Sequence, residues 1–434
     1  MPAIQYKDLL IDFTTEFVPL WNDKGTQADD SVTFWRPSTA SNALANFTPL
    51  GDVAINGYHN INQQKIVAVV SDVDPKNGTA LRAPIDFQLI WKHSGPRART
   101  AFSLWRAVAP DGYVAMGSVC GVGNDKPPLN TVRCVRADLV HTSYVSHRIW
   151  HDKGSGAEGD FSAWGVALCE TLPGETCFAP GTFVGVSSHI KPSMRDAAYV
   201  LRADFAPVRL PLPPLPTQMP AQQAHAAQVQ QCTYTCELPW FVVRDENLGP
   251  VEQLRTSPRY RLERRDHYQM VGIGRNEADT GRTFKWTTAK GENGSASANL
   301  AAATGIELIH EWSQPENTSP LGYSARLDKA FTQTTFSSEG WERPAALEVA
   351  AFVPANRAIA AFLQHSEYTL VRTDGSQLEL PVHYTDGEQV HFTELLPEEP
   401  ESTGNTDEND IVIQPALEAL EVTAHDVTDN ALLP

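Results

Sequence analysis

The segment Leu20-Trp21-Asn22-Asp23-Lys24-Gly25 determines the fold, because two further segments of the chain repeat its pattern. Its counterparts begin at Ile90-Trp91 and at Ile149-Trp150, and a second tryptophan follows each first tryptophan 14 positions later. The three pairs are Trp21 with Trp35, Trp91 with Trp105, and Trp150 with Trp164. A spacing that recurs every 59 to 70 residues indicates a triplicated β-module.

The copies continue in parallel after the tryptophans. A small turn element follows at residues 50–52, 116–118 and 184–186, and an apolar strand closes each copy at residues 66–70, 132–140 and 199–205. Each copy is therefore predicted to contain a strand, a polar loop, a strand, a turn and a strand. Such a short unit cannot bury both faces of its sheet, so three copies packed about an axis are predicted. The six tryptophans are then core residues, and a role in stacking on sugars or at a lipid interface is the alternative.

Several strings in this half resemble the vacuolar protein sorting sixty-two family. They are LWNDKG at 20–25, WRP at 35–37, GYVAMG at 112–117 and WHDKGSGA at 150–157. The resemblance covers roughly residues 10 to 206 and implies membrane traffic or, in bacterial members, a targeting module attached to toxin-like partners. It does not imply catalysis. The middle copy has Lys92-His93-Ser94-Gly95 in place of the acidic element, which favours ligand sites in the first and third copies.

Two polar loops, residues 22–30 and 151–160, are the predicted ligand-binding segments. The predicted ligand-binding residues are Asn22, Asp23, Lys24, Asp29, Asp30, His151, Asp152, Lys153, Glu158 and Asp160. Carboxylates clustered in a glycine-containing loop can hold sugar hydroxyls or coordinate calcium. A hydrated turn with a Lys–Asp pair is the alternative. No other cofactor or metal is expected.

The second half follows a linker rich in Pro and Gln, residues 207–231, and is predicted to be an elongated β domain over 232–396. Residues 281–338 form a long stretch of low hydrophobicity with Ser/Thr-rich alternation, and this layout resembles the membrane-inserting hairpin of aerolysin-like pore-forming toxins. The predicted insertion residues are Thr283, Phe284, Trp286, Ser295, Ser297, Thr332 and Phe336. An ordinary β-sandwich is the alternative. The predicted fold is all-β, a three-fold pseudo-symmetric β-prism joined to an elongated aerolysin-like domain.

The net charge of −18 is concentrated at the C-terminus. Residues 397–434 hold ten Asp or Glu and no Lys or Arg, which indicates either a solvated tail or a removable segment that blocks assembly. No basic stripe is present, so no nucleic acid partner is expected. The N-terminus lacks the pattern of a classical signal peptide, so the chain is expected to be made soluble, with later release toward a target membrane left open.

No catalytic motif occurs in a suitable context, so the chain is not expected to be an enzyme. Asp279-Thr280-Gly281 matches the short aspartic-protease string but has no second copy. The six cysteines fall into three local pairs, which leaves disulfides and free thiols both open.

The expected partners are a membrane lipid or glycan receptor and further copies of the chain, as a homo-oligomer on membranes. The expected function is that of a β-pore-forming toxin-like protein. A non-lytic lectin-like protein or membrane-trafficking adaptor is the alternative.

Overall fold

A computed structural model of the chain describes residues 3–93, 100–168, 175–193, 198–204, 208–216, 231–243, 245, 247–292, 309–311, 322–325, 344–378 and 380–395. The predicted all-β class is confirmed, since strands dominate and the described residues contain a single α-helix, α1 (Pro250–Thr256). Residues 1–396 form one compact unit. No helix within the described ranges is long and apolar enough to cross a membrane. The predicted acidic tail lies outside the described residues.

Residues 3–204, the repeat module, contain six equivalent strands in each copy, twice the predicted number. The first copy has β2 (Leu9–Thr14), β3 (Phe17–Asn22), β4 (Val32–Pro37), β5 (Thr48–Pro49), β6 (Val53–Asn56) and β7 (Val67–Asp72), preceded by β1 (Ile4–Tyr6). The second has β8 (Leu81–Arg82), β9 (Asp86–His93), β10 (Phe102–Val108), β11 (Tyr113–Val114), β12 (Ser118–Val122) and β13 (Cys134–Arg136). The third has β14 (Val140–Ser143), β15 (Val145–His151), β16 (Ser162–Val166), β17 (Glu175–Phe178), β18 (Val184–Val186) and β19 (Ala198–Asp204). Two 3-10 helices, η1 (Asn42–Leu44) and η2 (Ala137–Leu139), complete it.

The same two antiparallel sheets recur in each copy. One sheet carries the tryptophans and joins β3-β4-β6, β9-β10-β12 or β15-β16-β18. The other contains β2-β7-β5, β8-β13-β11 or β14-β19-β17. Every tryptophan sheet has a register shift beside its first tryptophan, which pairs with Phe34, Leu104 or Ala163. A shift repeated at the same place indicates a built-in β-bulge rather than a local irregularity.

The two tryptophans of each copy occupy different cores. Trp21, Trp91 and Trp150 meet in one cluster, where their ring centroids are 6.0 to 6.5 Å apart and the rings meet edge to face. The second tryptophans, Trp35, Trp105 and Trp164, each fill a separate cluster on the opposite face of their own sheet. Each copy therefore contributes its first tryptophan ring to the shared central cluster and packs its second tryptophan ring in a separate cluster.

A ring of backbone hydrogen bonds joins the copies at their turn elements and corrects one sequence assignment. Asp52 N–H donates to Ser118 O (2.9 Å), Ser118 N–H to Phe183 O (2.9 Å) and Phe183 N–H to Asp52 O (3.4 Å). The third turn element is therefore 181–183, with Thr182 at the position of Gly51 and Gly117, and not 184–186 as predicted. Gly185 lies within β18 instead. A Cβ on Gly117 would lie 2.7 Å from Thr182 Cβ, so this position tolerates few side chains.

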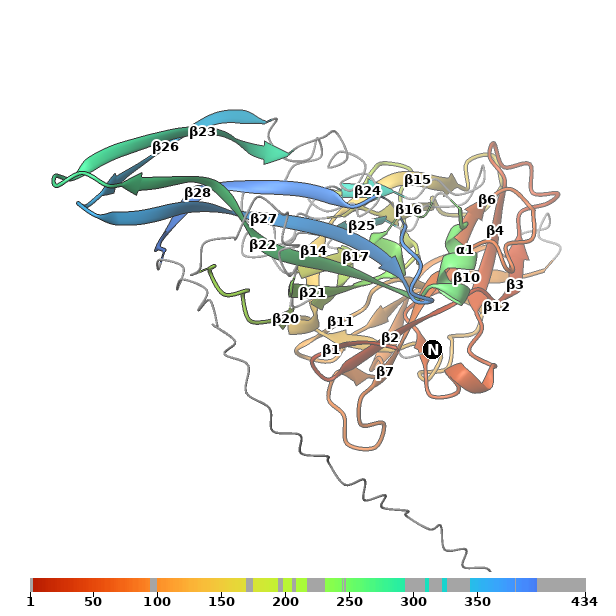
Figure 1. Ribbon diagram of the computed structural model, residues 1–434. Coiled ribbons are helices and arrows are strands. Elements are labelled where there is room, and N and C mark those ends of the chain that lie inside the picture. The colour runs from red at the N-terminus through yellow and green to blue at the C-terminus, as the bar shows by residue number, and fades with distance from the viewer. Residues whose placement is uncertain are drawn as a thin grey trace, which may run out of the picture. The chain divides into compact units, whose positions relative to one another are not determined.

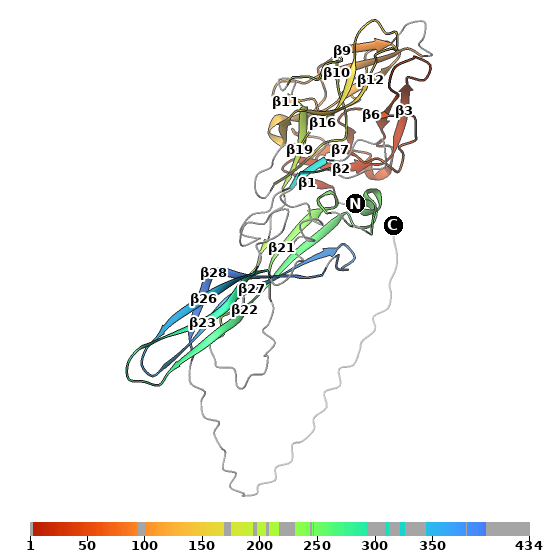
Figure 2. The same ribbon diagram turned by 90° about the horizontal axis from the view of Figure 1, so that it is seen from above.

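A domain of longer strands, here the long-strand domain, lies within residues 231–395. It contains β21 (Gln231–Pro239), η3 (Trp240–Val242), β22 (Arg259–Asn276), β23 (Arg282–Glu292), β26 (Ala345–Val353), β27 (Arg357–Arg372) and β28 (Val382–Glu394). Together with β20 (Val208–Arg209), the strands of this domain form one sheet in the order β20-β21-β22-β27-β28-β23-β26. Figures 1 and 2 show β22 and β27 running side by side along most of their length. The predicted elongated second domain therefore has the long antiparallel strands expected of it.

One apolar core joins the repeat module to the long-strand domain. Phe13 lies 5.3 Å from Trp240 in an edge-to-face contact, and Phe178 lies 4.6 Å from Phe241, measured between ring centroids. The predicted linker begins inside this structure, because β20 pairs with β21. Residues 217–230 of the linker lie outside the described residues. The described cysteines, Cys120, Cys134, Cys177, Cys232 and Cys236, form no disulfide with one another.

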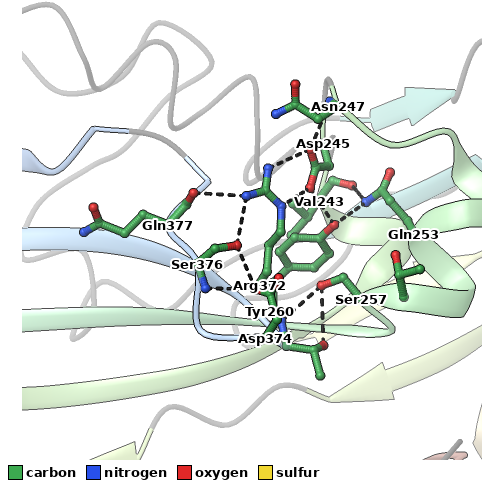
Figure 3. A network of polar contacts seen from close by, with 12 residues as sticks. Val243, Asp245, Asn247, Gln253, Ser257, Tyr260, Arg372, Asp374, Ser376 and Gln377 are labelled. Carbon is green, nitrogen blue, oxygen red and sulfur yellow. Dashed lines mark hydrogen bonds and ion pairs between the residues drawn. The ribbon is translucent and has the colours of Figure 1, made fainter.

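A buried polar network fixes the ends of the two longest strands (Figure 3). The guanidinium of Arg372, at the end of β27, makes two hydrogen bonds to Asp245 at 2.6 and 3.0 Å. Tyr260, near the start of β22, donates its hydroxyl to the same carboxylate at 3.1 Å. Burial raises the pKa of Asp245, but the hydrogen bonds and charge of Arg372, together with hydrogen bonds from Asn247 N–H and Tyr260, leave the pKa lowered. The ionised pair thus ties β22 and β27 to the segment that packs on the repeat module.

Candidate functional site

The polar loops of the first and third copies, here loop 1 (residues 22–30) and loop 3 (residues 151–160), have matching conformations. Thr26 and Ser155 each donate a backbone N–H to the carbonyl of the aspartate three residues earlier. Gly25 and Gly154 both have positive φ, at 90° and 84°. Gln27 also has a positive φ of 68°, where loop 3 has Gly156. The loop of the second copy, residues 94–99, lies outside the described residues.

Asp23 of loop 1 is buried and fully engaged by the protein itself. Its carboxylate accepts hydrogen bonds from Val32 N–H (3.0 Å), Tyr58 Oη (2.9 Å) and the indole of Trp150 (3.2 Å). Burial raises the pKa of Asp23 despite these bonds, and raises that of Tyr58 to about 12 with the help of Asp23. Asp23 therefore closes the loop and joins the first copy to the third.

Asp152 has the same place in loop 3. Its carboxylate accepts hydrogen bonds from Phe161 N–H (2.8 Å) and from the indole of Trp91 (3.0 Å), and lies 2.6 Å from His189 Nε2. The tryptophan of one copy thus donates to the loop of the next, which makes the loops part of the central core. Each aspartate has all the partners it needs without a ligand.

The groups of the two loops that face solvent form the remaining surface. They are Asn22, Lys24, Asp29, Lys153, Glu158 and Asp160, which are all exposed. The loops touch directly, because Asp29 N–H donates to Lys153 O at 2.9 Å. Asp30 is half-buried, 3.6 Å from His151 Nε2. The structure therefore brings seven of the ten predicted ligand residues into one polar surface, whereas Asp23, His151 and Asp152 are buried beneath it.

Two residues of this site were missed from the sequence. Tyr58 and His189, which bind Asp23 and Asp152, stand five positions after Val53 and Val184, the equivalent first residues of β6 and β18. The misplaced third turn element hid this correspondence. Lys24 Nζ also lies 4.5 Å from the ring centroid of Tyr58, a cation–π contact. Within the described ranges, no group of three or more His, Cys, Asp or Glu side chains is arranged to hold a metal ion.

The described insertion residues lie on β23, which pairs with β26 from Arg282↔Val353 to Lys290↔Ala345. Phe284 and Trp286 are half-buried and pack on glycines of β22, whereas Thr283 is exposed. A Cβ on Gly272 would lie 2.3 Å from Trp286 Cδ1, and one on Gly274 would lie 2.8 Å from Phe284. These glycines thus make room for the two aromatic rings. Ser295, Ser297, Thr332 and Phe336 lie outside the described residues.

The connection between β23 and β26 reaches the repeat module. Its described parts, β24 (Ile309–Glu311) and β25 (Gly322–Ala325), form an antiparallel pair, and β25 adds to the edge of β17. Residues Thr176, Cys177 and Phe178 stand opposite Ala325, Ser324 and Tyr323. The backbone of β25 therefore joins a sheet of the third copy, in the order β14-β19-β17-β25-β24.

Three histidines lie in a row across the long strands. His365 of β27 lies 4.8 Å from His267 of β22 and 5.5 Å from His383 of β28, measured between ring centroids. Burial, with the charges of the two other histidines, lowers the pKa of His365 to about 4, while Asp266 opposes the shift. Burial also lowers the pKa of His267. The folded state thus favours the neutral imidazoles of His365 and His267.

We expect acid to weaken the long-strand domain through His365. The pKa of His365 is lower in the folded than in the unfolded chain. Its contribution to the free energy of unfolding is therefore complete above pH 6.5 and is lost as the pH falls toward 4. The loss amounts to about 3 kcal/mol. The variant His365→Gln should reduce the difference in urea midpoint between pH 7 and pH 4.5, and the control His391→Gln should not. An unchanged difference in His365→Gln would contradict this assignment.

Comparison with known proteins finds a matching family model and several similar solved structures, two of which follow. Residues 3–218 match the model of a family described as vacuolar protein sorting-associated protein 62. The chain is similar to GNIP1Aa from Chromobacterium piscinae, with 28% identity over 44% of this chain and 35% of that chain and a TM-score of 0.37. It is also similar to Cry35Ab1, with 11% identity over 90% of each chain and a TM-score of 0.33. The match thus spans about a third of GNIP1Aa. The comparison with curated proteins found no match.

Proposed function

We propose, from the premise that residues 3–218 belong to the vacuolar protein sorting-associated protein 62 family, that this chain recognises a membrane and perforates it. The repeat module binds a glycan or lipid receptor. The long-strand domain then oligomerises with further copies and inserts β-hairpins. No step requires catalysis.

The observation that carries the proposal is the register of β23 and β26. They are antiparallel partners up to Lys290↔Ala345, and the 52 residues numbered 293–344 join their ends. If the pairing continued into this connection, each strand would gain about 20 residues or more, above the about 9–11 that a membrane-spanning strand needs. The β23–β26 hairpin can therefore lengthen at the end where the connection joins the two strands, without a change of register.

The surface of loops 1 and 3 supports the recognition step. Lys24 and Lys153 stand beside exposed carboxylates and amides, a mixture that suits the hydroxyls of a glycan or a zwitterionic lipid headgroup. Buried Asp23 and Asp152 fix the loop backbones, so binding costs little ordering of the loops. Calcium binding by these loops remains a separate proposal. It predicts that a chelator added to the assay below reduces membrane binding.

Release of a trapped fluorophore from liposomes tests the function. We expect the full chain to release dye from vesicles made of lipid and glycolipid extracts of a susceptible cell, and to form SDS-resistant oligomers on them. The variant Lys24→Ala/Lys153→Ala should reduce membrane binding at least tenfold, whereas Lys76→Ala, an exposed lysine outside both loops, should bind as wild type does. Absence of both leakage and oligomers, before and after limited proteolysis, would overturn the proposal.

Similarity to a family named for vacuolar protein sorting favours a second function. In this alternative the repeat module is a non-lytic lectin-like or trafficking adaptor, and the long-strand domain is a scaffold. Receptor binding that depends on Lys24 and Lys153, with vesicles that stay intact, would favour this alternative.

A further inference from the structure

A cavity of about 390 Å³ lies where the repeat module meets the long-strand domain. Its walls come from β1 and β2 on one side and from β21, α1 and β22 on the other. A second hollow of about 510 Å³ shares Asp12, Phe13 and Leu254 with it. Both volumes lie in the range that holds small ligands, and the junction of two domains is a common place for such sites.

Apolar and aromatic side chains form much of the cavity wall. Ile4, Ile11 and Leu238 line it together with Phe13 and Trp240, whose rings meet edge to face. Trp240 is only 2% exposed, and its indole N–H has no acceptor in the described part of the chain. Two perpendicular aromatic rings with an unused polar group are suited to a ligand that has both an apolar body and a polar end.

Not all charged side chains of the cavity wall have an ion-pair partner among the described residues. Its two arginines are already paired, Arg259 with Glu237 and Arg261 with Glu263, each at 2.6 Å. Asp12 and Asp204 have no salt-bridge partner among the described residues. The half-buried carboxylate of Asp12 accepts one hydrogen bond, from Phe13 N–H at 2.8 Å. Burial is the largest influence on the pKa of both aspartates and raises it, and it outweighs the opposing charges of the N-terminal amine on Asp12 and of Arg202 and Lys7 on Asp204.

We infer that this cavity binds a small organic cation, an amine or quaternary ammonium with an apolar body. The positive group pairs with Asp12 and the apolar body lies against Phe13 and Trp240. A cation near an aromatic ring and a poorly solvated carboxylate gains from both. Because both domains supply walls, the bound cation stabilises their junction. This site is distinct from loops 1 and 3 and does not depend on pore formation.

Calorimetric titration of the full chain with benzyltrimethylammonium tests the inference. We expect saturable binding at pH 7, at least tenfold weaker binding in Asp12→Asn, and no binding of phenylacetate, which has a similar ring but a negative charge. The control Asp111→Asn, an exposed aspartate outside the cavity, should bind as wild type does. Equal binding of both ions, or undiminished binding in a folded Asp12→Asn chain, would overturn the inference.

A second variant keeps the test decisive if Asp12→Asn fails to fold. Val208→Trp enlarges a side chain of the cavity wall that is 57% exposed, and it leaves every charge in place. We expect it to weaken binding of benzyltrimethylammonium at least tenfold while the melting temperature of the free chain changes little. Undiminished affinity in Val208→Trp would show that the cation binds elsewhere.

Discussion

A single Ser324→Cys substitution is expected to abolish membrane leakage under oxidising conditions, with full recovery on reduction. Ser324 of β25 stands directly opposite Cys177 of β17, a buried cysteine. Opposite residues of antiparallel strands have Cα atoms about 4.5–5.5 Å apart, within the range that a disulfide spans. The new disulfide would hold the connection between β23 and β26 on the repeat module, where it cannot lengthen the hairpin.

The control variants for this disulfide change residues of the same two strands. Ser324→Cys combined with Cys177→Ala cannot form the bond and should leak under both conditions. The variant Tyr323→Cys changes the position whose backbone pairs with Phe178, which is not a cysteine, so it should also stay active. Mass spectrometry of unreduced peptides establishes that the bond has formed. If the locked chain leaks as fast as the reduced chain, insertion does not use this connection, whereas a wild type that never leaks contradicts the pore function itself.

Much of the repeat module could be predicted from the sequence because its signals are local and periodic. The 14-residue spacing of the tryptophans fixes equivalent positions in the three copies, and the structure places them in equivalent cores. The third turn element was misplaced because Val184-Gly185-Val186 imitates the pattern, while the true equivalent, Thr182, is not a glycine. Only the hydrogen-bond ring through Asp52, Ser118 and Phe183 identifies it.

The roles of single polar residues could not be predicted in the same way. Asp23 and Asp152 resemble ligand groups in the sequence, but their partners, Trp150 and Trp91, come from other copies more than 60 positions away. The pairing of β25 with β17 joins residues about 150 positions apart, and no local pattern encodes it. Alternation of apolar and polar residues indicates a strand but not its neighbour.

The shared aromatic centre also makes the three copies depend on one another. Arg36 adds to this dependence, because its guanidinium binds Asp52 at 2.8 and 2.9 Å and also the carbonyl of Cys120 in the second copy at 2.7 Å. Asp52 in turn accepts the N–H of Cys120 at 2.7 Å. Arg36 of the WRP string and Asp52 of the first turn element thus form one partly buried ion pair at the junction of copies. The module is therefore expected to unfold as a unit.

Trp150→Ala is expected to be the most damaging single substitution in the repeat module, at about 5 kcal/mol. Removing a buried tryptophan costs about 3–5 kcal/mol, and here it also takes the indole donor from Asp23 and from the carbonyl of Asp30. Trp164→Ala is the matched control, because its ring packs within its own copy and its indole donates to the nearby Ser162. We expect it to cost about 3 kcal/mol. Urea unfolding monitored by fluorescence measures both.

The combined change Trp91→Ala/Trp150→Ala tests whether the centre is shared. The two rings are 6.0 Å apart, so the first substitution already removes part of what the second would lose. The double variant should therefore be destabilised by less than the sum of the single variants, by about 1 kcal/mol or more. The pair Trp105→Ala/Trp164→Ala, whose rings lie in separate clusters, should be additive. Additivity in both pairs would show that the three copies keep independent cores.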